Sequence, residues 1–105
     1  LSGAPRSVAA DLIRWAVSQS TPVLALDAPS GVDTTNGAVR EPAIQADATM
    51  TLALPKEGLR ASPARDRVGE LYLADISVPP DLYDSPALGL EVGALFSKSD
   101  IVRLL

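Results

Sequence analysis

A short apolar run that ends in a carboxylate and a rigid turn constrains the fold of this chain more than any other feature. Residues 23–26 are all apolar, Asp27 follows at once, and residues 29–31 are Pro-Ser-Gly. A strand that is apolar at every position is typical of a parallel sheet covered on both faces. In open α/β sheets, ligands bind just outside the carboxyl ends of such strands. The segment therefore predicts an α/β domain with its site at this turn.

Apolar residues at helical spacing precede this strand, and further strand patterns follow it. Val8, Leu12, Ile13 and Ala16 form the predicted buried stripe of the helix, with Trp15 packed at its edge. Helix, then strand, then turn is typical of a βαβ unit whose first strand lies before the helix. The predicted elements are a helix from a cap at Ser2 or Gly3 to near Gln19, strands at 23–26, 49–54 and 70–76, a hairpin between Val32 and Val39, a short helix at 57–65, a short strand within 88–95 and a last helix at 98–105.

Composition narrows the classes of function. The chain has 105 residues, of which 47% are hydrophobic, as expected for one small globular domain. It has no Cys and no His, so thiolate metal sites are excluded and proton transfer falls to Asp, Glu, Lys, Tyr or water. A net charge of −4 without a Lys/Arg cluster argues against a nucleic-acid partner. No apolar run approaches the roughly 20 residues of a membrane span, and no signal pattern opens the chain. We therefore expect a cytoplasmic protein without a membrane partner.

The first residues indicate that the sequence is an excerpt. The chain opens on Leu1 instead of Met, and residues 1–5 are typical of the end of a loop that leads into a helix. We therefore expect the first strands of the sheet to lie upstream. The alternative is a processed or trimmed domain that is complete as it stands.

Asp27 is the first candidate for a role in chemistry. Its backbone is fixed by the strand, and its carboxylate can accept hydrogen bonds from ribose hydroxyls or move a proton. It can equally cap the turn by accepting the N–H groups of residues 29–31, and local sequence leaves both alternatives open. Ser30 can offer an oxygen to a small cation or a phosphate, and Gly31 permits positive φ or the close approach of a ligand. Ordinary turn chemistry also explains both residues.

Other polar residues near predicted strand ends are weaker candidates. Lys56 follows the second strand and is placed on the same rim as Asp27, where its ammonium suits a phosphate or is simply solvated. We favour a solvated loop position for Asp33, a cap at the start of a strand for Asp47, and a structural role for Asp75. Residues 1–4 precede a helix and suit an anion. The sequence has no dinucleotide glycine fingerprint, P-loop or nucleophile elbow.

Several short segments, taken together and in order, resemble one known family. The resemblance is to the second half of the NAD(P)H-hydrate epimerase family, the YjeF N-terminal domain, over most of residues 1–83. The most specific segments are Asp-x-Pro-Ser-Gly at 27–31 and Ala-Asp-x-Thr-x-Thr at 46–51. The others are Leu-Ser-Gly-Ala-Pro at 1–5, Asn-Gly at 36–37, Leu-Pro-Lys-Glu-Gly-Leu at 54–59 and Gly-Glu-Leu-Tyr-Leu-Ala-Asp-Ile at 69–76.

This resemblance implies a fold, an activity and a set of site residues. The fold would be a Rossmann-like three-layer α/β/α sandwich, of which this chain holds a part. The activity would be the interconversion of the R and S epimers of hydrated NADH and NADPH at C6 of the nicotinamide ring, in nucleotide repair. At matching positions, Asp27 would contact the substrate and be the catalytic residue, and Ser30 would help to ligate one potassium ion. The substrate-binding segment would end with Leu1, Ser2, Gly3 and Ala4.

The resemblance also bears on domains and partners. The family's upstream glycine-rich loop and a second potassium-ligating aspartate are absent, so we expect the 105 residues alone to be inactive. Residues 1–95 would be the C-terminal part of the epimerase domain, and residues 96–105 a terminal helix or a connector to a following domain. Besides the small-molecule substrate, a second copy in a homodimer and an ADP- or ATP-dependent NAD(P)HX dehydratase, fused or separate, are open as partners.

Two alternatives to this activity stay open. Some relatives with this fold have lost catalysis and serve as interaction modules in RNA-decay assemblies or as lipoprotein partners, although the presence of Asp27 and Ser30 argues against that role here. A generic nucleotide- or sugar-binding α/β domain is the second alternative. Within the epimerase hypothesis, the sequence does not separate an acid/base role for Asp27 from that of a ribose or ring anchor.

Overall fold

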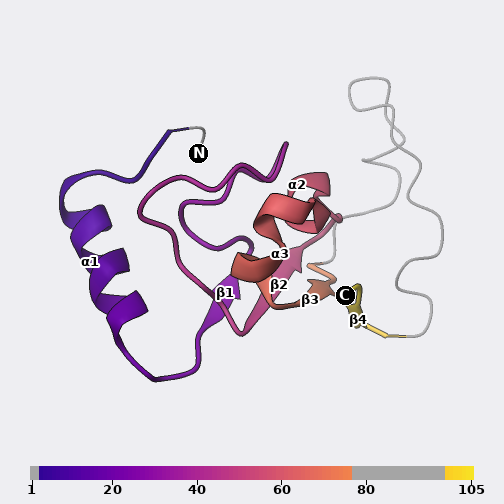
Figure 1. Ribbon diagram of the computed structural model, residues 1–105. Helices are drawn as coiled ribbons and strands as arrows, with labels where there is room; N and C mark the ends of the chain where they lie inside the picture. Colours follow the sequence, from indigo (N-terminus) through magenta and orange to yellow (C-terminus); the bar gives the residue numbers. More distant parts are fainter. Residues whose placement is uncertain (1–2, 77–98) are drawn as a thin grey trace.

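The computed structural model describes residues 3–76 and 99–105, which form a mixed sheet with helices (Figure 1). The strands run in the spatial order β1-β2-β3-β4, with the first three parallel and β4 antiparallel to β3. This arrangement confirms the α/β class. The elements are α1 (Ser7–Ser18), β1 (Leu24–Leu26), β2 (Ala48–Leu52), α2 (Glu57–Arg60), α3 (Ser62–Val68), β3 (Glu70–Ala74) and β4 (Ile101–Arg103).

The register of the three parallel strands brings their carboxyl ends to one edge of the sheet. Leu26 pairs with Met50, and Met50 pairs with Tyr72. Because these strands point the same way, the chain leaves β1 and β2 at neighbouring positions on the same edge. This edge is the place where α/β sheets bind ligands.

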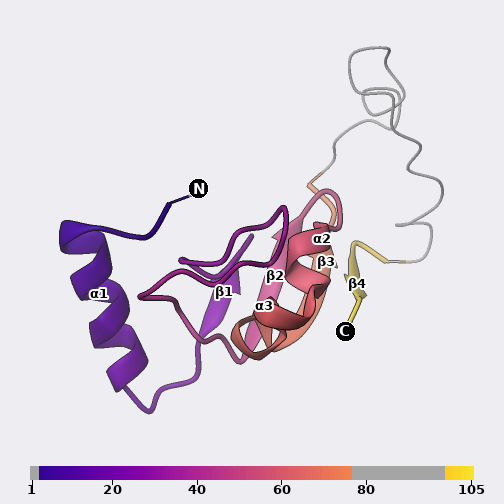
Figure 2. The same cartoon turned by 45° about the horizontal axis from the view of Figure 1, so that its top comes forward.

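Helices α2 and α3 cover one face of the sheet and form the core with it (Figure 2). Leu59 of α2, Val68 of α3 and Leu71 of β3 are fully buried in one cluster. The single helix predicted at 57–65 is in fact two helices, because Ala61 between them is extended, with φ −70° and ψ 145°. Pro63 lies in the first turn of α3, where its fixed φ fits a helix.

The described residues do not cover the opposite face of β1. Leu24 and Leu26 are 64% and 70% exposed, whereas Ala25 between them is buried. The prediction of a strand covered on both faces is therefore wrong for the described residues. The reason is that α2 and α3 lie on one side, while α1 lies beyond β1 in both views (Figures 1 and 2).

Helix α1 packs less of its surface than its sequence predicts. Only Ala10 and Ile13 are buried, and Val8, Leu12 and Trp15 are largely exposed. The predicted caps are also wrong: the helix begins after Arg6, and no side chain caps it. The chain turns sharply at the first helical residue, which has φ +52°. The end near Gln19 is confirmed.

The remaining predictions have mixed outcomes. Val32 and Val39 form the expected antiparallel bridge. The helix predicted at 98–105 is wrong, because residues 101–103 form β4 and the N–H of Leu104 donates to the Leu71 carbonyl at 2.7 Å. This pairing satisfies the backbone groups at the outer edge of β3. The strand predicted within 88–95 lies outside the described residues. Among the helices of residues 3–76 and 99–105, none is long and apolar enough to cross a membrane.

Thr49 joins β2 to the end of α3, and its loss should weaken the fold. Its buried hydroxyl donates a hydrogen bond of 2.8 Å to the Val68 carbonyl. Thr49→Val keeps the shape but leaves that carbonyl unpaired, so we expect a loss of about 1–2 kcal/mol in the free energy of unfolding. Urea denaturation measures it, with the exposed Thr35→Val as the matched control. Equal losses in the two variants would contradict this account.

Candidate functional site

Strand β1 ends in a sharp turn that carries Asp27. The backbone of Asp27 has φ +69°, and the N–H of Ala28 donates to the Leu26 carbonyl at 2.9 Å. The N–H of Asp27 itself still pairs with the neighbouring strand, at 2.7 Å from the Met50 carbonyl oxygen. Positive φ is uncommon for a residue with a side chain, although Asp tolerates it better than most. Strained backbone of this kind clusters at functional sites.

Strand β2 ends in a turn of the same kind. Ala53 has φ +68°, and the N–H of Leu54 donates to the Leu52 carbonyl at 2.8 Å. The chain then reaches Lys56, whose Nζ donates back to the carbonyl oxygens of Leu52 and Leu54 at 3.1 and 3.3 Å. The turn therefore fixes the lysine side chain over the end of its own strand.

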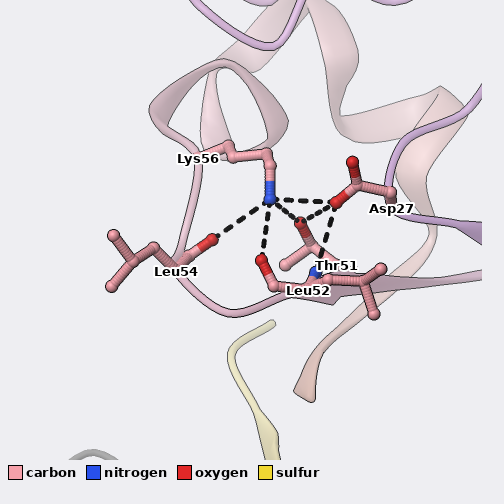
Figure 3. Close-up of polar contacts among 5 residues, drawn as sticks. All are labelled: Asp27, Thr51, Leu52, Leu54 and Lys56. Atoms are coloured by element: carbon pink, nitrogen blue, oxygen red, sulfur yellow. Dashed lines mark hydrogen bonds and ion pairs between the residues drawn. The ribbon is translucent and has the colours of Figure 1, made fainter. Parts of the chain in front are cut away.

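The two turns bring Asp27 and Lys56 into direct contact (Figure 3). Lys56 Nζ lies 2.9 Å from Asp27 Oδ1 and 2.7 Å from Thr51 Oγ1. The same Oδ1 accepts hydrogen bonds from Thr51 Oγ1 at 3.3 Å and from the Leu52 N–H at 3.2 Å. We call these four residues, together with Leu54, the strand-end cluster.

The cluster decides between several of the alternatives left open by the sequence. The placement of Lys56 on the same rim as Asp27 is confirmed, and its side chain is only 27% exposed, so it is not a freely solvated lysine. The carboxylate of Asp27 does cap a backbone group. It accepts the Leu52 N–H on the neighbouring strand instead of the N–H groups of its own turn. The end of β2 is thereby tied to the end of β1.

The surroundings of Asp27 set its charge. Burial is the largest single influence on the Asp27 carboxyl, and it raises the pKa. The groups that lower the pKa together outweigh burial. These are the hydrogen bond and positive charge of Lys56, the Leu52 N–H and the Thr51 hydroxyl, and they hold the pKa of Asp27 below its usual 3.8. Asp27 is therefore an ionised carboxylate at neutral pH.

This lowered pKa predicts how stability depends on pH. An acid whose pKa is lower in the folded state stabilises the fold above its unfolded pKa and loses that contribution as the pH falls through the folded value. The stability that Asp27 adds relative to Asp27→Asn should thus be complete above about pH 3.8 and shrink below it. Urea denaturation of both proteins between pH 7 and pH 3 measures it. A difference that grows as the pH falls would contradict this account.

A cavity of about 610 Å³ lies beside the strand-end cluster. Gly3, Ala4 and Arg6 line it from the loop before α1, and Asp27, Ser30 and Lys56 line it from the strand ends. Its volume falls within the range of about 300–1,000 Å³ that is usual for small-molecule sites. Two of the four residues predicted to end the substrate-binding segment therefore border the same cavity as Asp27. The other two, Leu1 and Ser2, lie outside the described residues.

The turn after Asp27 is held by its own backbone. The N–H of Val32 donates to the Pro29 carbonyl at 3.1 Å, and Gly31 has φ +95°. A Cβ on Gly31 would lie 2.7 Å from Ala43 atoms. The lack of a side chain at Gly31 therefore lets the loop that carries Ala43 pack closely against this turn. Ser30 is exposed at the cavity, and its hydroxyl has no hydrogen-bond partner among the described residues.

Ser30 offers one oxygen atom to a cation at the cavity. A hydroxyl oxygen is a ligand that hard cations accept, and this one is free to turn toward the cavity. In the described part of the chain, no group of three or more Asp, Glu, His or Cys side chains could hold a metal ion. Ser30 can thus contribute one ligand, and the described residues do not form a full coordination shell.

The weaker candidates have structural roles. Asp33 accepts the N–H of Thr35 at 2.8 Å within its loop, and Asp47 accepts the N–H of Val23 at 2.7 Å just before β1. The roles favoured for these two residues are confirmed. The N–H of Asp75 donates to the Asp100 carbonyl at 2.7 Å, which ties the end of β3 to the segment before β4.

Sequence reasoning missed two residues at the site. Thr51 is fully buried and contacts both Asp27 and Lys56, yet in the sequence it is only one of several strand residues. Its signal was the alternation of Thr49 and Thr51, which places both hydroxyls on the covered face. Arg6 borders the cavity, and its signal was a cation next to the predicted binding segment.

The fold and site together define an α/β domain with a cavity at the carboxyl ends of its parallel strands. Comparison with known families makes this class specific. A family model described as YjeF-related protein N-terminus matches residues 1–58. The chain belongs to this family.

Curated relatives agree with that assignment. The chain is 39% identical over 88 residues to the NAD(P)H-hydrate epimerase of Dehalogenimonas lykanthroporepellens, covering 84% of this chain and 34% of that protein. It is 38% identical over 91 residues to the NAD(P)H-hydrate epimerase of Truepera radiovictrix, covering 87% of this chain and 39% of the relative. The bifunctional NAD(P)H-hydrate repair enzyme Nnr of Salinibacter ruber is 40% identical over 76 residues, which cover 72% of this chain and 14% of that enzyme. The chain thus spans between one seventh and two fifths of the length of these relatives.

Proposed function

We propose that this chain is part of an enzyme that interconverts the R and S epimers of hydrated NADH and NADPH at C6 of the nicotinamide ring. The observation that carries the proposal is the ionised Asp27, paired with Lys56 at 2.9 Å, on the wall of a cavity at the strand ends. The names of the relatives support the same substrate.

The chemistry of the reaction suits a carboxylate. Epimerisation at C6 requires that a proton be moved, or that the C6 hydroxyl be expelled and added again. A positioned carboxylate suffices for general acid–base catalysis of either route, so the lack of His is no obstacle. Because hydrated nicotinamide rings also open spontaneously, positioning and electrostatic stabilisation can supply much of the remaining acceleration.

The cavity offers places for the rest of the substrate. Gly3 and Ala4 line it with little side chain, which lets a ligand approach the backbone. Arg6 borders the same space, and its guanidinium suits a phosphate group of the nucleotide. In this proposal Leu1 and Ser2 continue the same binding segment. Asp27 and the turn that follows it form the opposite wall of the cavity.

Potassium is part of the proposal. Ser30 would supply one ligand through its hydroxyl, and the bound ion would add positive charge close to the negatively charged substrate. The expected result is higher epimerase activity of the intact protein in potassium than in sodium chloride at equal ionic strength. Ser30→Ala should weaken that preference. An activity that is equal in the two salts would contradict the potassium site and leave the epimerase proposal standing.

The proposal extends to the domain and its partners. Residues 1–95 would belong to one epimerase domain. The pairing of β3 with β2 at five register positions supports this for residues 48–74, and the pairing of β4 with β3 joins residues 101–103 to the same sheet. A dehydratase, fused or separate, would act on the product. The name of the relative from Salinibacter ruber, a bifunctional repair enzyme, supports a second activity in the same protein. A homodimer stays open as the assembly, and size-exclusion chromatography with light scattering tests it.

The test of the proposed function is direct. The intact natural protein should interconvert the two epimers of hydrated NADPH well above the spontaneous rate, as followed by chromatography. Rates equal to the buffer control would overturn the proposal and favour a non-catalytic interaction module of the same fold.

A further inference from the structure

The proposed function uses Asp27 and leaves Lys56 without a role. The side chain of Lys56 cannot be treated as a generic cation at the rim, because its partners are already fixed. An ammonium group has three N–H donors. Four oxygens lie within 3.3 Å of Nζ, and they belong to Asp27, Thr51, Leu52 and Leu54. The chain's own atoms therefore use the full donor capacity of Lys56.

The two oxygens of the Asp27 carboxylate have different surroundings. Oδ1 takes contacts from Lys56 Nζ, Thr51 Oγ1 and the Leu52 N–H. Oδ2 has no hydrogen bond from the described residues, and Figure 3 shows it pointing away from the lysine. The side chain is 49% exposed, so a ligand can reach it. One oxygen is thus held and the other is free.

We propose that Lys56 is a positioning residue of this site, which holds Asp27 by Oδ1 so that Oδ2 serves as the base toward the hydrated nicotinamide ring. This inference rests on the proposed function. Thr51 completes the arrangement, since it accepts from Lys56 at 2.7 Å and donates to Oδ1 at 3.3 Å. Lys56 borders the cavity, but its N–H donors are used within the chain, so it acts through Asp27.

An ionised Oδ2 fits a ring-opening route in which atoms and electrons balance. Oδ2 takes the proton of the C6 hydroxyl while the bond between C6 and the ring nitrogen breaks, and the electron pair goes to that nitrogen. The nitrogen then receives the same proton from Oδ2, which leaves an open aldehyde. After rotation about the bond to C6, the reverse steps close the ring on the other face. Asp27 ends ionised, and no further reactant is consumed.

Two substitutions separate charge from geometry in the intact protein. Lys56→Met removes the charge, so we expect kcat to fall about 100-fold or more with little change in KM. The acid limb of the pH profile of kcat/KM should move up by about 1–3 units. Lys56→Arg keeps the charge, but a planar guanidinium does not match the four oxygen atoms that surround the compact ammonium of Lys56. Its acid limb should therefore stay near that of the wild type while kcat still falls.

The matched control is Arg60→Met, an exposed cation on α2, which should leave both kinetic constants and the pH profile unchanged. A wild-type kcat and acid limb in Lys56→Met would overturn the inference. A rise in KM alone would overturn it as well, because Lys56 would then bind the substrate. Where Lys56→Met does not fold, as judged by circular dichroism, Lys56→Arg and Thr51→Val carry the test through the same kcat and KM measurements, and an unchanged kcat in both would overturn it.

A titration without substrate separates this inference from the proposed function. Carbon-13 NMR of the Asp27 carboxyl group should show its titration midpoint move to higher pH in Lys56→Met. If the wild type is inactive on hydrated cofactors, the proposed function fails, while this shift still shows whether Lys56 controls Asp27. An unchanged midpoint would overturn the inference that Lys56 controls Asp27, whether or not the enzyme is active on hydrated cofactors.

Discussion

Replacing Asp27 by Asn in the intact protein should lower kcat for epimerisation by about 1,000-fold, within the range of about 10²–10⁴ expected for a general base. Asn is nearly the same size, and its carbonyl oxygen can still accept the hydrogen bonds from Leu52 and Thr51. It cannot take a proton at neutral pH. The loss should therefore appear in kcat with little change in KM, as measured from initial rates with a purified epimer.

The control for this substitution is Asp33→Asn. Asp33 caps its own loop through the Thr35 N–H, so its substitution should leave kcat within about twofold of the wild type. Near-normal kcat with a raised KM in Asp27→Asn would instead make Asp27 an anchor for the ring or the ribose. That result would contradict the base assigned to Oδ2.

The substitution Gly58→Ala should give a large loss of stability. A Cβ at this position would collide with the Thr34 carbonyl group and would lie 2.5 Å from the Asp33 carbonyl oxygen. The N–H of Gly58 also donates to the Thr34 carbonyl at 2.8 Å, so the loop after Asp27 cannot move away without losing a bond. We expect a loss of about 3 kcal/mol in the free energy of unfolding, as for overpacking in a dense site, measured by urea denaturation.

Gly3→Ala is the matched control, because nothing lies within 4 Å of a Cβ added there. Its stability should stay within about 0.5 kcal/mol of the wild type. Gly58→Ala should also lower kcat, since Lys56 is two residues away and would shift with the backbone. Equal stability in the two variants would contradict the close packing of α2 on the loop.

Much of the fold could be predicted from local patterns. The apolar run at 23–26 contains β1, the Thr-rich run at 49–54 overlaps β2, and the pattern at 70–76 contains β3. Asp47 at the start of a strand was recognised as a cap. These features depend on local sequence: the alternation of residue types, strand propensity and turn chemistry. They can be predicted without knowing which strand pairs with which.

The site could be predicted only in outline, because its contacts are set by register. Asp27 and Thr51 are far apart in the chain and meet only because Leu26 pairs with Met50. Two residues with positive φ, Asp27 and Ala53, then aim Asp27 and Lys56 at each other, and neither is a glycine that would signal such a turn. The strand β4 was missed for a related reason, since pairing with β3 overrides local helical spacing.

We propose above that this site belongs to an enzyme that equilibrates the two epimers of hydrated NADPH. The most direct measurement starts the intact wild-type protein separately from the pure R and the pure S epimer and follows both by chromatography. Both reactions should reach the same R/S ratio as the uncatalysed mixture, much faster than in buffer and much faster than with Asp27→Asn. Time courses that match the buffer control from both starting epimers would contradict this proposal.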